Sequence, residues 1–254
     1  MTLSNNLEAK LPSANDFLPG SLEQDYVGKM IIVEGSDGSG RSTHIRLLQD
    51  WLEWRGYAVS NAGLKRSKLL GKDLGELARS NELQTRTRLL LYATDLYDQI
   101  EQTVIPSLRA GFIVLMDRSA LTLAARASVR GVDREYLTNL FRYLPSASAS
   151  FLLEVPPETA FKRLFAQEQK LMHLEFGGDM AIEGTVYERF MAYQRQLQAE
   201  LNKRANSWGC ERIDADRSVQ AVNADLRARI ASLLNIEDTH YRPSEKLLSV
   251  WNES

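Results

Sequence analysis

The chain has 254 residues, of which 44% are hydrophobic and 25% are charged, and its formal net charge is −2. This length and composition are typical of a single folded domain and exclude a disordered or fibrous chain. The near-neutral charge argues against binding to duplex nucleic acid, and the single cysteine excludes an internal disulfide framework.

The ends of the chain differ from its middle. Residues 1–27 lack sustained periodicity, so we expect a flexible N-terminal extension. Residues 28–235 are expected to form one domain, followed by a tail over 236–254 that could dock on the body or on a neighbouring subunit. The sequence contains no apolar run long enough to cross a membrane and no secretory signal pattern. We therefore expect a cytoplasmic protein without a membrane partner.

Between these ends, predicted strands and helices alternate. Short apolar runs predict strands near 30–33, 57–59, 112–116, 151–155 and 210–213. Helical spacing predicts helices after residue 41, over 89–104 with a break near Pro106, after Asp133, after Pro157, over 185–206 and over 218–234. Strands separated by helices are typical of a parallel sheet that is covered on both faces.

A glycine-rich segment, GSDGSGRST, lies between the first predicted strand and the first predicted helix. It has the form GxxxxG[K/R]S, in which backbone N–H groups and the helix N-terminus bind phosphate oxygens and the serine hydroxyl binds Mg²⁺. Arg41 stands where lysine is usual. The residues expected to bind the phosphates of a triphosphate are Gly35, Gly38, Ser39, Gly40, Arg41, Ser42 and Thr43, and Ser42 is the expected metal ligand among them.

A second motif, Asp117-Arg118, follows the predicted strand over 112–116. Ligands of open parallel sheets bind beyond the carboxyl ends of the strands, so these side chains are expected near the phosphate loop. Asp117 is a candidate ligand of Mg²⁺ through water, and Arg118 is a candidate contact to a second phosphate.

These motifs, with Tyr-Ala-Thr-Asp at 92–95 and LLEVPPETAFKR at 152–163, resemble the thymidylate kinases of the nucleoside monophosphate kinase group. The resemblance covers roughly residues 28–235. It implies a P-loop kinase fold, a three-layer α/β/α arrangement around a parallel sheet of about five strands. It also implies transfer of the γ-phosphoryl group from ATP, with Mg²⁺, to a nucleoside 5′-monophosphate, with dTMP as the expected acceptor.

The resemblance also implies roles for individual residues. Asp37 is expected near the sugar and phosphate of the acceptor, Tyr92 on its base and Arg118 on its phosphate, while Asp117 organises Mg²⁺. Arg41, Asp117 and Arg118 are therefore candidate catalytic residues. The partners are small-molecule nucleotides, and the apolar helix over 89–108 is a possible homodimer interface.

The chain departs from the family pattern at four places. Arg41 replaces the loop lysine, and Leu96 stands where an arginine commonly recognises the thymine edge. The segment after the second strand differs, although Lys65 and Arg66 within it are candidate contacts to the acceptor phosphate. The lid, at about 165–184, is poor in arginine, so Arg163 just before it becomes the candidate catalytic arginine.

Two other functions remain compatible with these residues. Asp117-Arg118-Ser119 also resembles a motif of deoxynucleoside kinases. The departures from the family pattern would equally suit a nucleotide-binding protein with little or no kinase activity. Assays of a nucleoside and of its 5′-monophosphate separate the first of these alternatives from a nucleoside monophosphate kinase.

Overall fold

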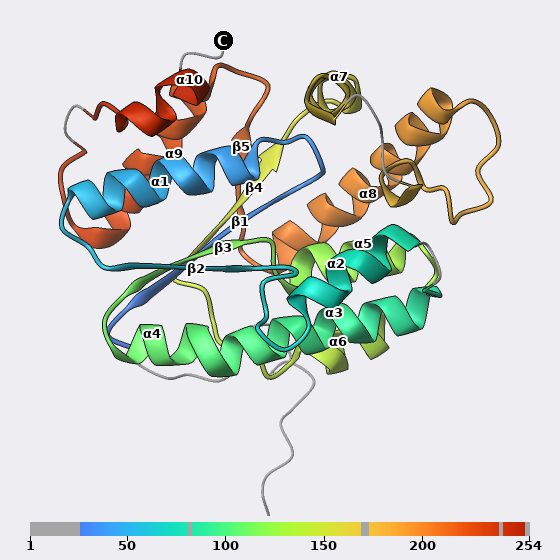
Figure 1. Cartoon of the computed structure of the whole chain (residues 1–254), viewed down its shortest axis with the longest axis horizontal. Coiled ribbons are helices and arrows are strands. Elements are labelled where there is room, and N and C mark those ends of the chain that lie inside the picture. Colours follow the sequence, from blue (N-terminus) through green and yellow to red (C-terminus); the bar gives the residue numbers. More distant parts are fainter. Residues whose placement is uncertain (1–25, 81–82, 169–172, 239–240, 252–254) are drawn as a thin grey trace, which may run out of the picture.

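A computed structural model describes residues 26–80, 83–168, 173–238 and 241–251. Its centre is a parallel sheet of five strands in the order β2-β3-β1-β4-β5 (Figure 1). The predicted three-layer α/β/α class is thereby confirmed. The strands are β1 (Lys29–Gly35), β2 (Val59–Gly63), β3 (Ile113–Asp117), β4 (Ala149–Glu154) and β5 (Glu211–Asp214).

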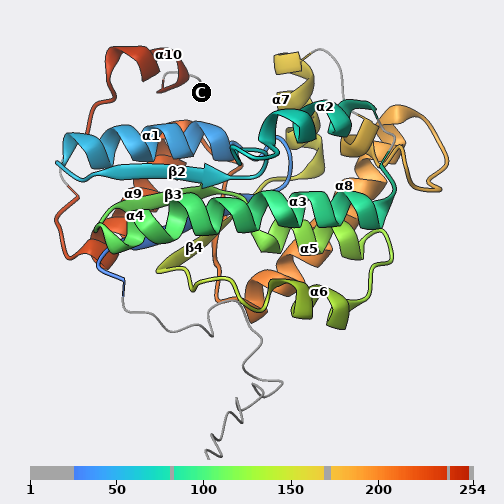
Figure 2. The same cartoon turned by 60° about the horizontal axis from the view of Figure 1, so that its bottom comes forward.

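Helices cover both faces of this sheet. In Figures 1 and 2, α1 and α9 lie on one face, and α3, α4 and α5 lie on the other. The helices are α1 (Arg41–Trp54), α2 (Gly71–Ser80), α3 (Thr85–Gln99), α4 (Ile105–Arg109), α5 (Ala120–Ser128), α6 (Arg134–Phe141), α7 (Pro157–Glu168), α8 (Val186–Ser207), α9 (Val219–Leu234) and α10 (Leu248–Trp251).

Alternation along the strands divides the core into two main clusters. Successive strand residues point to opposite faces, so Ile31 and Val33 pack against α1 and α9, while Met30 and Ile32 pack against α3 and α5. Both faces of β1 are therefore buried, as expected for a parallel sheet between helical layers. The carboxyl ends of β1 and β3 lie side by side, with Val33 paired to Asp117 in the register.

Several predicted helix starts agree with the structure. The Asp133 side chain accepts a hydrogen bond from the Tyr136 N–H at 2.9 Å, and Thr185 and Glu188 form a reciprocal capping box at the start of α8. The predicted break at Pro106 is wrong. The helix continues from α3 through a π-helical segment, Ile100–Val104, into α4, and this local change of period accommodates Pro106 in the first turn of α4.

The tail docks on the body of its own chain. The Tyr241 hydroxyl donates to Oδ2 of Asp50 on α1 at 2.6 Å, and the Ser244 N–H donates to the same oxygen at 3.1 Å. Tyr241 also meets Trp251 edge-on, with 5.8 Å between the ring centroids. Residues 1–25 of the expected N-terminal extension lie outside the described residues. Within the described part of the chain, no helix combines the length and the hydropathy needed to span a membrane.

Candidate active site

The glycine-rich segment connects β1 to α1, as the sequence predicts. Gly38 lies in this loop with φ 76°, and a Cβ atom there would lie 2.6 Å from the Ala160 carbonyl oxygen of α7. Only glycine combines this left-handed backbone with so close an approach. Ser42 and Thr43 lie in the first turn of α1, whose N-terminal N–H groups and helix dipole favour an anion.

The Arg41 side chain folds back under the loop. Its Nη1 atom lies 2.6 Å from the Gly35 carbonyl oxygen and 3.1 Å from Ser39 Oγ, and it also contacts the Ser36 carbonyl. Its Nε atom donates to Oδ1 of Asp117 at 3.0 Å. Burial lowers the pKa of Arg41 to about 10, so the guanidinium stays charged at neutral pH. Arg41 therefore ties the loop to the end of β3.

Asp117 and Ser42 form the part of the site that suits a magnesium ion. Ser42 Oγ donates to Asp117 Oδ2 at 2.7 Å. Burial would raise the pKa of Asp117, but Arg41 and Ser42 lower it below its usual range, so the carboxylate is ionised. Hydroxyl and carboxylate oxygens fit Mg²⁺, which binds few protein ligands and completes its shell with phosphate and water. Accordingly, the described residues contain no cluster of three or more His, Cys, Asp or Glu side chains for a protein-only metal cage.

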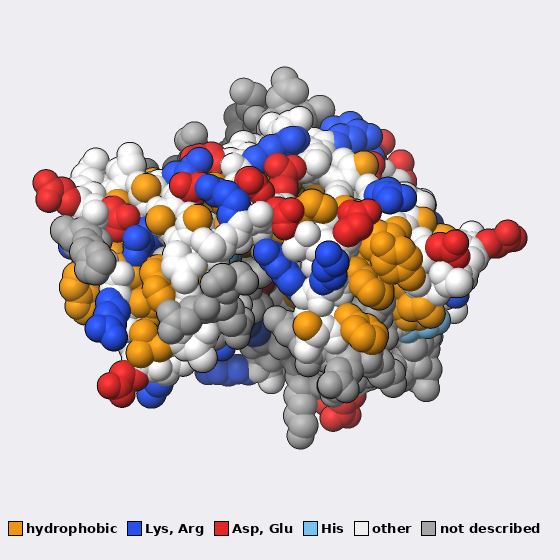
Figure 3. Space-filling view, turned by 90° about the horizontal axis from the view of Figure 1, so that it is seen from above, with side chains coloured by type: hydrophobic (Ala, Val, Ile, Leu, Met, Phe, Trp, Pro, Cys, Tyr) orange, Lys and Arg blue, Asp and Glu red, His pale blue; other side chains and the backbone are white. Residues whose placement is uncertain are grey.

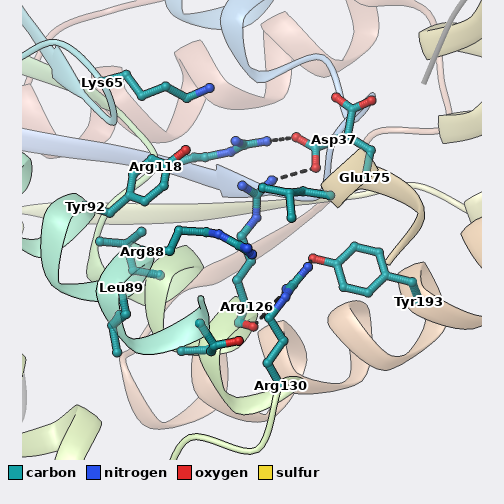
Figure 4. Close-up of a pocket in the computed structure, with 14 residues that line it drawn as sticks. Asp37, Lys65, Arg88, Leu89, Tyr92, Arg118, Arg126, Arg130, Glu175 and Tyr193 are labelled. Carbon is teal, nitrogen blue, oxygen red and sulfur yellow. Dashed lines mark hydrogen bonds and ion pairs between the residues drawn. The ribbon is translucent and has the colours of Figure 1, made fainter. Parts of the chain in front are cut away.

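Asp37 holds two arginines at the boundary between the loop and a neighbouring cavity. Its Oδ1 atom accepts from Arg118 and its Oδ2 atom accepts from Arg126 at 2.6 Å (Figure 4). Burial would raise the pKa of Asp37, but the two guanidinium charges hold it well below its usual range. Arg118 has φ 69°, a left-handed backbone that is uncommon outside glycine and that occurs preferentially at functional sites.

The cavity beyond Asp37 is cationic on one part of its wall and apolar on another. Tyr92, Leu89 and Leu123 contribute the apolar part, and Tyr92 is buried. Asp37 and Glu175 are the carboxylates among its described lining residues. The cationic side chains that line it are Lys65, Arg88, Arg118, Arg126 and Arg130.

The segment that carries Lys65 is held by the motif at 92–95. The backbone N–H groups of Lys65 and Ser67 donate to the two carboxylate oxygens of Asp95, at 2.7 and 3.0 Å. Lys65 thus lines the cavity, whereas Arg66 lies toward Asp117, with 3.9 Å between Nη2 and Oδ2. The side chain of Arg66 is 41% exposed, so this ion pair is weak in the absence of ligand.

Two residues discussed from the sequence lie away from the cavity wall. Arg163 of α7 donates to the Ala215 carbonyl oxygen, after β5, at 3.1 Å, and it does not line the cavity. This contact places Arg163 next to the carboxyl end of β5, because Ala215 directly follows that strand. Leu96, a residue of α3, is 1% exposed and packs in the hydrophobic core, so it does not face the cavity either.

Several residues of the site were missed from the sequence, among them Arg88, Arg126, Arg130 and Glu34. Arg126 lies on α5, a helix that the periodicity did not reveal. Glu34 is fully buried at the end of β1 and accepts hydrogen bonds from Ser119, at 2.8 Å from its N–H, and from the Thr122 hydroxyl. Burial raises the pKa of Glu34. The sequence did offer one signal for Glu34. This acidic residue directly follows an apolar run and precedes the glycine-rich segment.

The face seen in Figure 3 carries interspersed cationic and anionic side chains among its described residues, with hydrophobic groups between them.

The family model for thymidylate kinase matches residues 33–225, which is more than half of the chain and includes the loop, Asp117 and α5. The chain belongs to the thymidylate kinase family. Members of this family are nucleoside monophosphate kinases, so the chain is an enzyme of this class and the resemblance found in its sequence is confirmed.

Individual members of the thymidylate kinase family align over most of the chain. A protein of Saccharolobus solfataricus named "Probable thymidylate kinase 2" is 32% identical over 201 residues, which are 79% of this chain and 94% of that protein. A "Probable thymidylate kinase" of Thermococcus kodakarensis is 27% identical over 82% of this chain and 99% of its own length. A "Thymidylate kinase" of an Exiguobacterium species is 29% identical over 78% of this chain and 92% of its own length.

Proposed function

We propose that this thymidylate kinase family member transfers the γ-phosphoryl group of ATP to dTMP and releases dTDP and ADP, with Mg²⁺ as cofactor. The observation that carries the proposal is the pairing of Arg118 and Arg126 with Asp37, between the phosphate loop and the cationic cavity. Among the described residues, five cationic side chains and two carboxylates line that cavity. This charge favours a dianionic phosphate ester as the acceptor. The names of the aligned relatives support thymidine as its nucleoside.

In this mechanism, a phosphate oxygen of dTMP forms a bond to the γ-phosphorus of ATP while the bond from that phosphorus to the β-phosphate oxygen breaks. No covalent intermediate with the protein is needed. The loop and the N-terminus of α1 bind the donor phosphates, and Arg118 and Arg126 hold the acceptor phosphate in line with them. Ser42 and Asp117 would hold Mg²⁺, which when bound would supply positive charge to the transferring phosphates. Arg41 keeps the loop and β3 in register.

The two alternative functions have different support. A nucleoside kinase would bind an uncharged acceptor, which would leave the guanidinium groups of Arg118 and Arg126 without an anionic ligand. One set of contacts supports the other alternative, a binding protein with little turnover. The Arg41 side chain is held by loop carbonyl oxygens and by Asp117, and is not directed away from them. Turnover is therefore the quantity to measure.

The test is an ADP-release assay with ATP and Mg²⁺ that compares dTMP, dUMP, dCMP, dGMP, AMP and thymidine. We expect dTMP to give the highest kcat/KM and thymidine to give no turnover. Asp117→Ala should abolish turnover, whereas Asp225→Ala, at an exposed ion pair of α9, should not. Turnover of thymidine but not of dTMP would establish the nucleoside kinase. ATP binding without transfer to any acceptor would establish the binding protein.

A cytoplasmic location and a homodimer stay predictions. The apolar face of α3 proposed for the dimer contributes Leu89, Ala93 and Leu96 to the core of its own chain. Leu90, on the opposite side of the helix, is 44% exposed. Size-exclusion chromatography with light scattering of the whole chain and of Leu90→Asp tests whether this side forms an interface.

A further inference from the structure

A second cavity lies between α5, α6 and α8, three helices that lie next to one another in Figure 2. Its volume is about 140 Å³. On α5, Ala124 and Ser128 line it. Leu123 and Arg126, on a different side of the same helix, line the cavity beyond Asp37. Among the described residues, none lines both cavities, so the second cavity is separate from the candidate active site.

Positive charge predominates in the second cavity. The cationic side chains of Arg134, Lys203 and Arg204 line it, and Glu200 is the one carboxylate among its described lining residues. Oε1 of Glu200 lies 3.8 Å from Nζ of Lys203, and Oε2 lies 3.5 Å from Nε of Arg204. Neither ion pair is also a hydrogen bond. A single carboxylate is thus shared by two of the three cations and bonds tightly to neither.

Arg204 is the cation that is both buried and incompletely bonded. The residue is 9% exposed, and its Nη2 atom donates to Oγ of Ser128. Among the described residues, this is the one hydrogen bond of its guanidinium, which carries roughly five N–H groups, and Nε has no hydrogen-bond partner. Burial lowers the pKa of Arg204; Glu200 opposes this effect, and the charge of Arg134 adds to it. Buried charged donors without acceptors are unfavourable, so an anion in the cavity would stabilise this side chain.

We propose that this cavity binds a phosphate group, as free phosphate or as a phosphate monoester, through the guanidinium of Arg204. A phosphate offers several acceptor oxygens and more than one negative charge, which suit the planar fork of an arginine. Ser128 Oγ accepts from Arg204, so the O–H of Ser128 remains as a second donor to the ligand. Lys203 and Arg134 add positive charge from the rim.

The apolar part of the wall strengthens these interactions. Leu137, Phe141 and Trp208 line the cavity beside the cations. Apolar groups limit the access of water, and charged hydrogen bonds are stronger where the local dielectric constant is low. A phosphate bound at Ser128 would lie at the end of α5, two residues from Arg126, and Trp208 would report on it.

The test is a fluorescence titration of the whole chain with inorganic phosphate at an ionic strength held constant with NaCl. The chain has four tryptophans, Trp51, Trp54, Trp208 and Trp251, of which Trp208 lines the cavity. We expect a saturable change in fluorescence in the wild type and its loss in Trp208→Phe. Arg204→Gln should weaken phosphate binding by about tenfold or more, because a charge-assisted contact is lost.

Two further variants separate this site from other arginines. Arg229→Gln, at an ion pair of α9 whose arginine side chain is 37% exposed, is the matched control and should bind phosphate as the wild type does. Arg126→Ala removes an arginine of the cavity beyond Asp37, and it too should leave the Trp208 titration unchanged. If Arg204→Gln does not fold, Lys203→Gln, at a side chain that is 63% exposed, serves in its place and should weaken binding severalfold.

The outcomes decide the proposal independently of the kinase assay. A change that does not saturate, an affinity that is the same in Arg204→Gln, or a titration abolished by Arg126→Ala alone would overturn it. Ribose 5-phosphate is titrated in parallel. Saturation by ribose 5-phosphate would identify the ligand as a phosphate monoester, and saturation by inorganic phosphate alone would identify free phosphate; either result supports the proposal. Absent turnover in the ADP-release assay would count against the proposed function and not against this site.

Discussion

The Nε atom of Arg41 donates to Oδ1 of Asp117 at 3.0 Å, while the other carboxylate oxygen of Asp117 accepts from Ser42. The cation of the phosphate loop is thus paired with the carboxylate of the proposed metal site. A planar guanidinium can reach the Gly35 carbonyl and Asp117 together, whereas the compact ammonium of lysine cannot do both equally well. Arginine in place of the usual lysine in this loop therefore changes how much of the negative charge of Asp117 is available to a metal ion.

Arg41→Lys should lower the Mg²⁺ concentration required for half-maximal activity by about fivefold, because Asp117 loses part of its neutralising contact. The measurement is a Mg²⁺ titration of ADP release at saturating ATP and dTMP. Arg195→Lys, at an exposed position on α8, is the control. An unchanged or higher Mg²⁺ requirement would show that the Arg41 contact does not restrict Asp117.

Arg126→Ala should raise the KM for dTMP by about tenfold to a hundredfold, since it removes a charge-assisted contact proposed for the acceptor phosphate. The KM for ATP should stay within about twofold, because Arg126 lies on the acceptor side of Asp37. Steady-state kinetics with each substrate varied in turn measures both values, and Arg195→Ala is the matched control. Equal changes in the two KM values would contradict a role on the acceptor side alone.

Asp37→Asn should lower the free energy of unfolding by about 3 kcal/mol, because Arg118 and Arg126 are left as neighbouring charges without a carboxylate. Urea denaturation followed by circular dichroism at pH 7 measures the loss. In the wild type the folded-state pKa of Asp37 is depressed, so its contribution is present above about pH 4 and is lost as the pH falls further. The loss between pH 5 and pH 3 should be smaller in Asp37→Asn, and an equal loss would refute the assignment.

His44 should make stability depend on pH near neutrality. Burial, and then the charge of Arg163, lower the pKa of His44 to about 4 from a usual value of 6.5. Below pH 6.5 the unfolded chain takes up a proton that the folded chain does not bind, so stability falls as the pH falls toward 4. The expected loss between pH 7.5 and pH 5.5 is about 1.4 kcal/mol.

Urea denaturation at these two pH values should show this loss in the wild type and in His173→Gln, but not in His44→Gln. A loss of the same size in His44→Gln would assign it to another group. His44 is 3% exposed, so circular dichroism must first verify that His44→Gln is folded. The same check applies to His173→Gln.

Local patterns were sufficient for the sheet and for the donor side of the site. Apolar strands that alternate with helices predict a parallel sheet, and the loop and Asp117 each follow a predicted strand, so both were expected at one edge. The helix start at Asp133 followed from a capping side chain, because a cap depends only on residues within one turn. The starts at Thr185 and Ser218 followed from helical spacing, and the structure shows that both residues cap their helices. The helix through Pro106 was not predicted, because a π-helical turn leaves no clear mark in the spacing of apolar residues.

The acceptor side depended on contacts between distant parts of the chain. Arg126 is separated from Asp37 by 89 positions, and Arg130 is separated from Asp179 by 49. A surface arginine and a ligand-binding arginine look alike in sequence, since what distinguishes them is the carboxylate that the fold brings to each. The sequence by itself determined the sheet and the phosphate loop, because these depend on local periodicity and on backbone geometry, while the class of reaction followed from the resemblance of its motifs to the thymidylate kinases. Only the tertiary structure decided which charges meet in the cavity, because their pairing depends on how α3, α5 and the lid pack together.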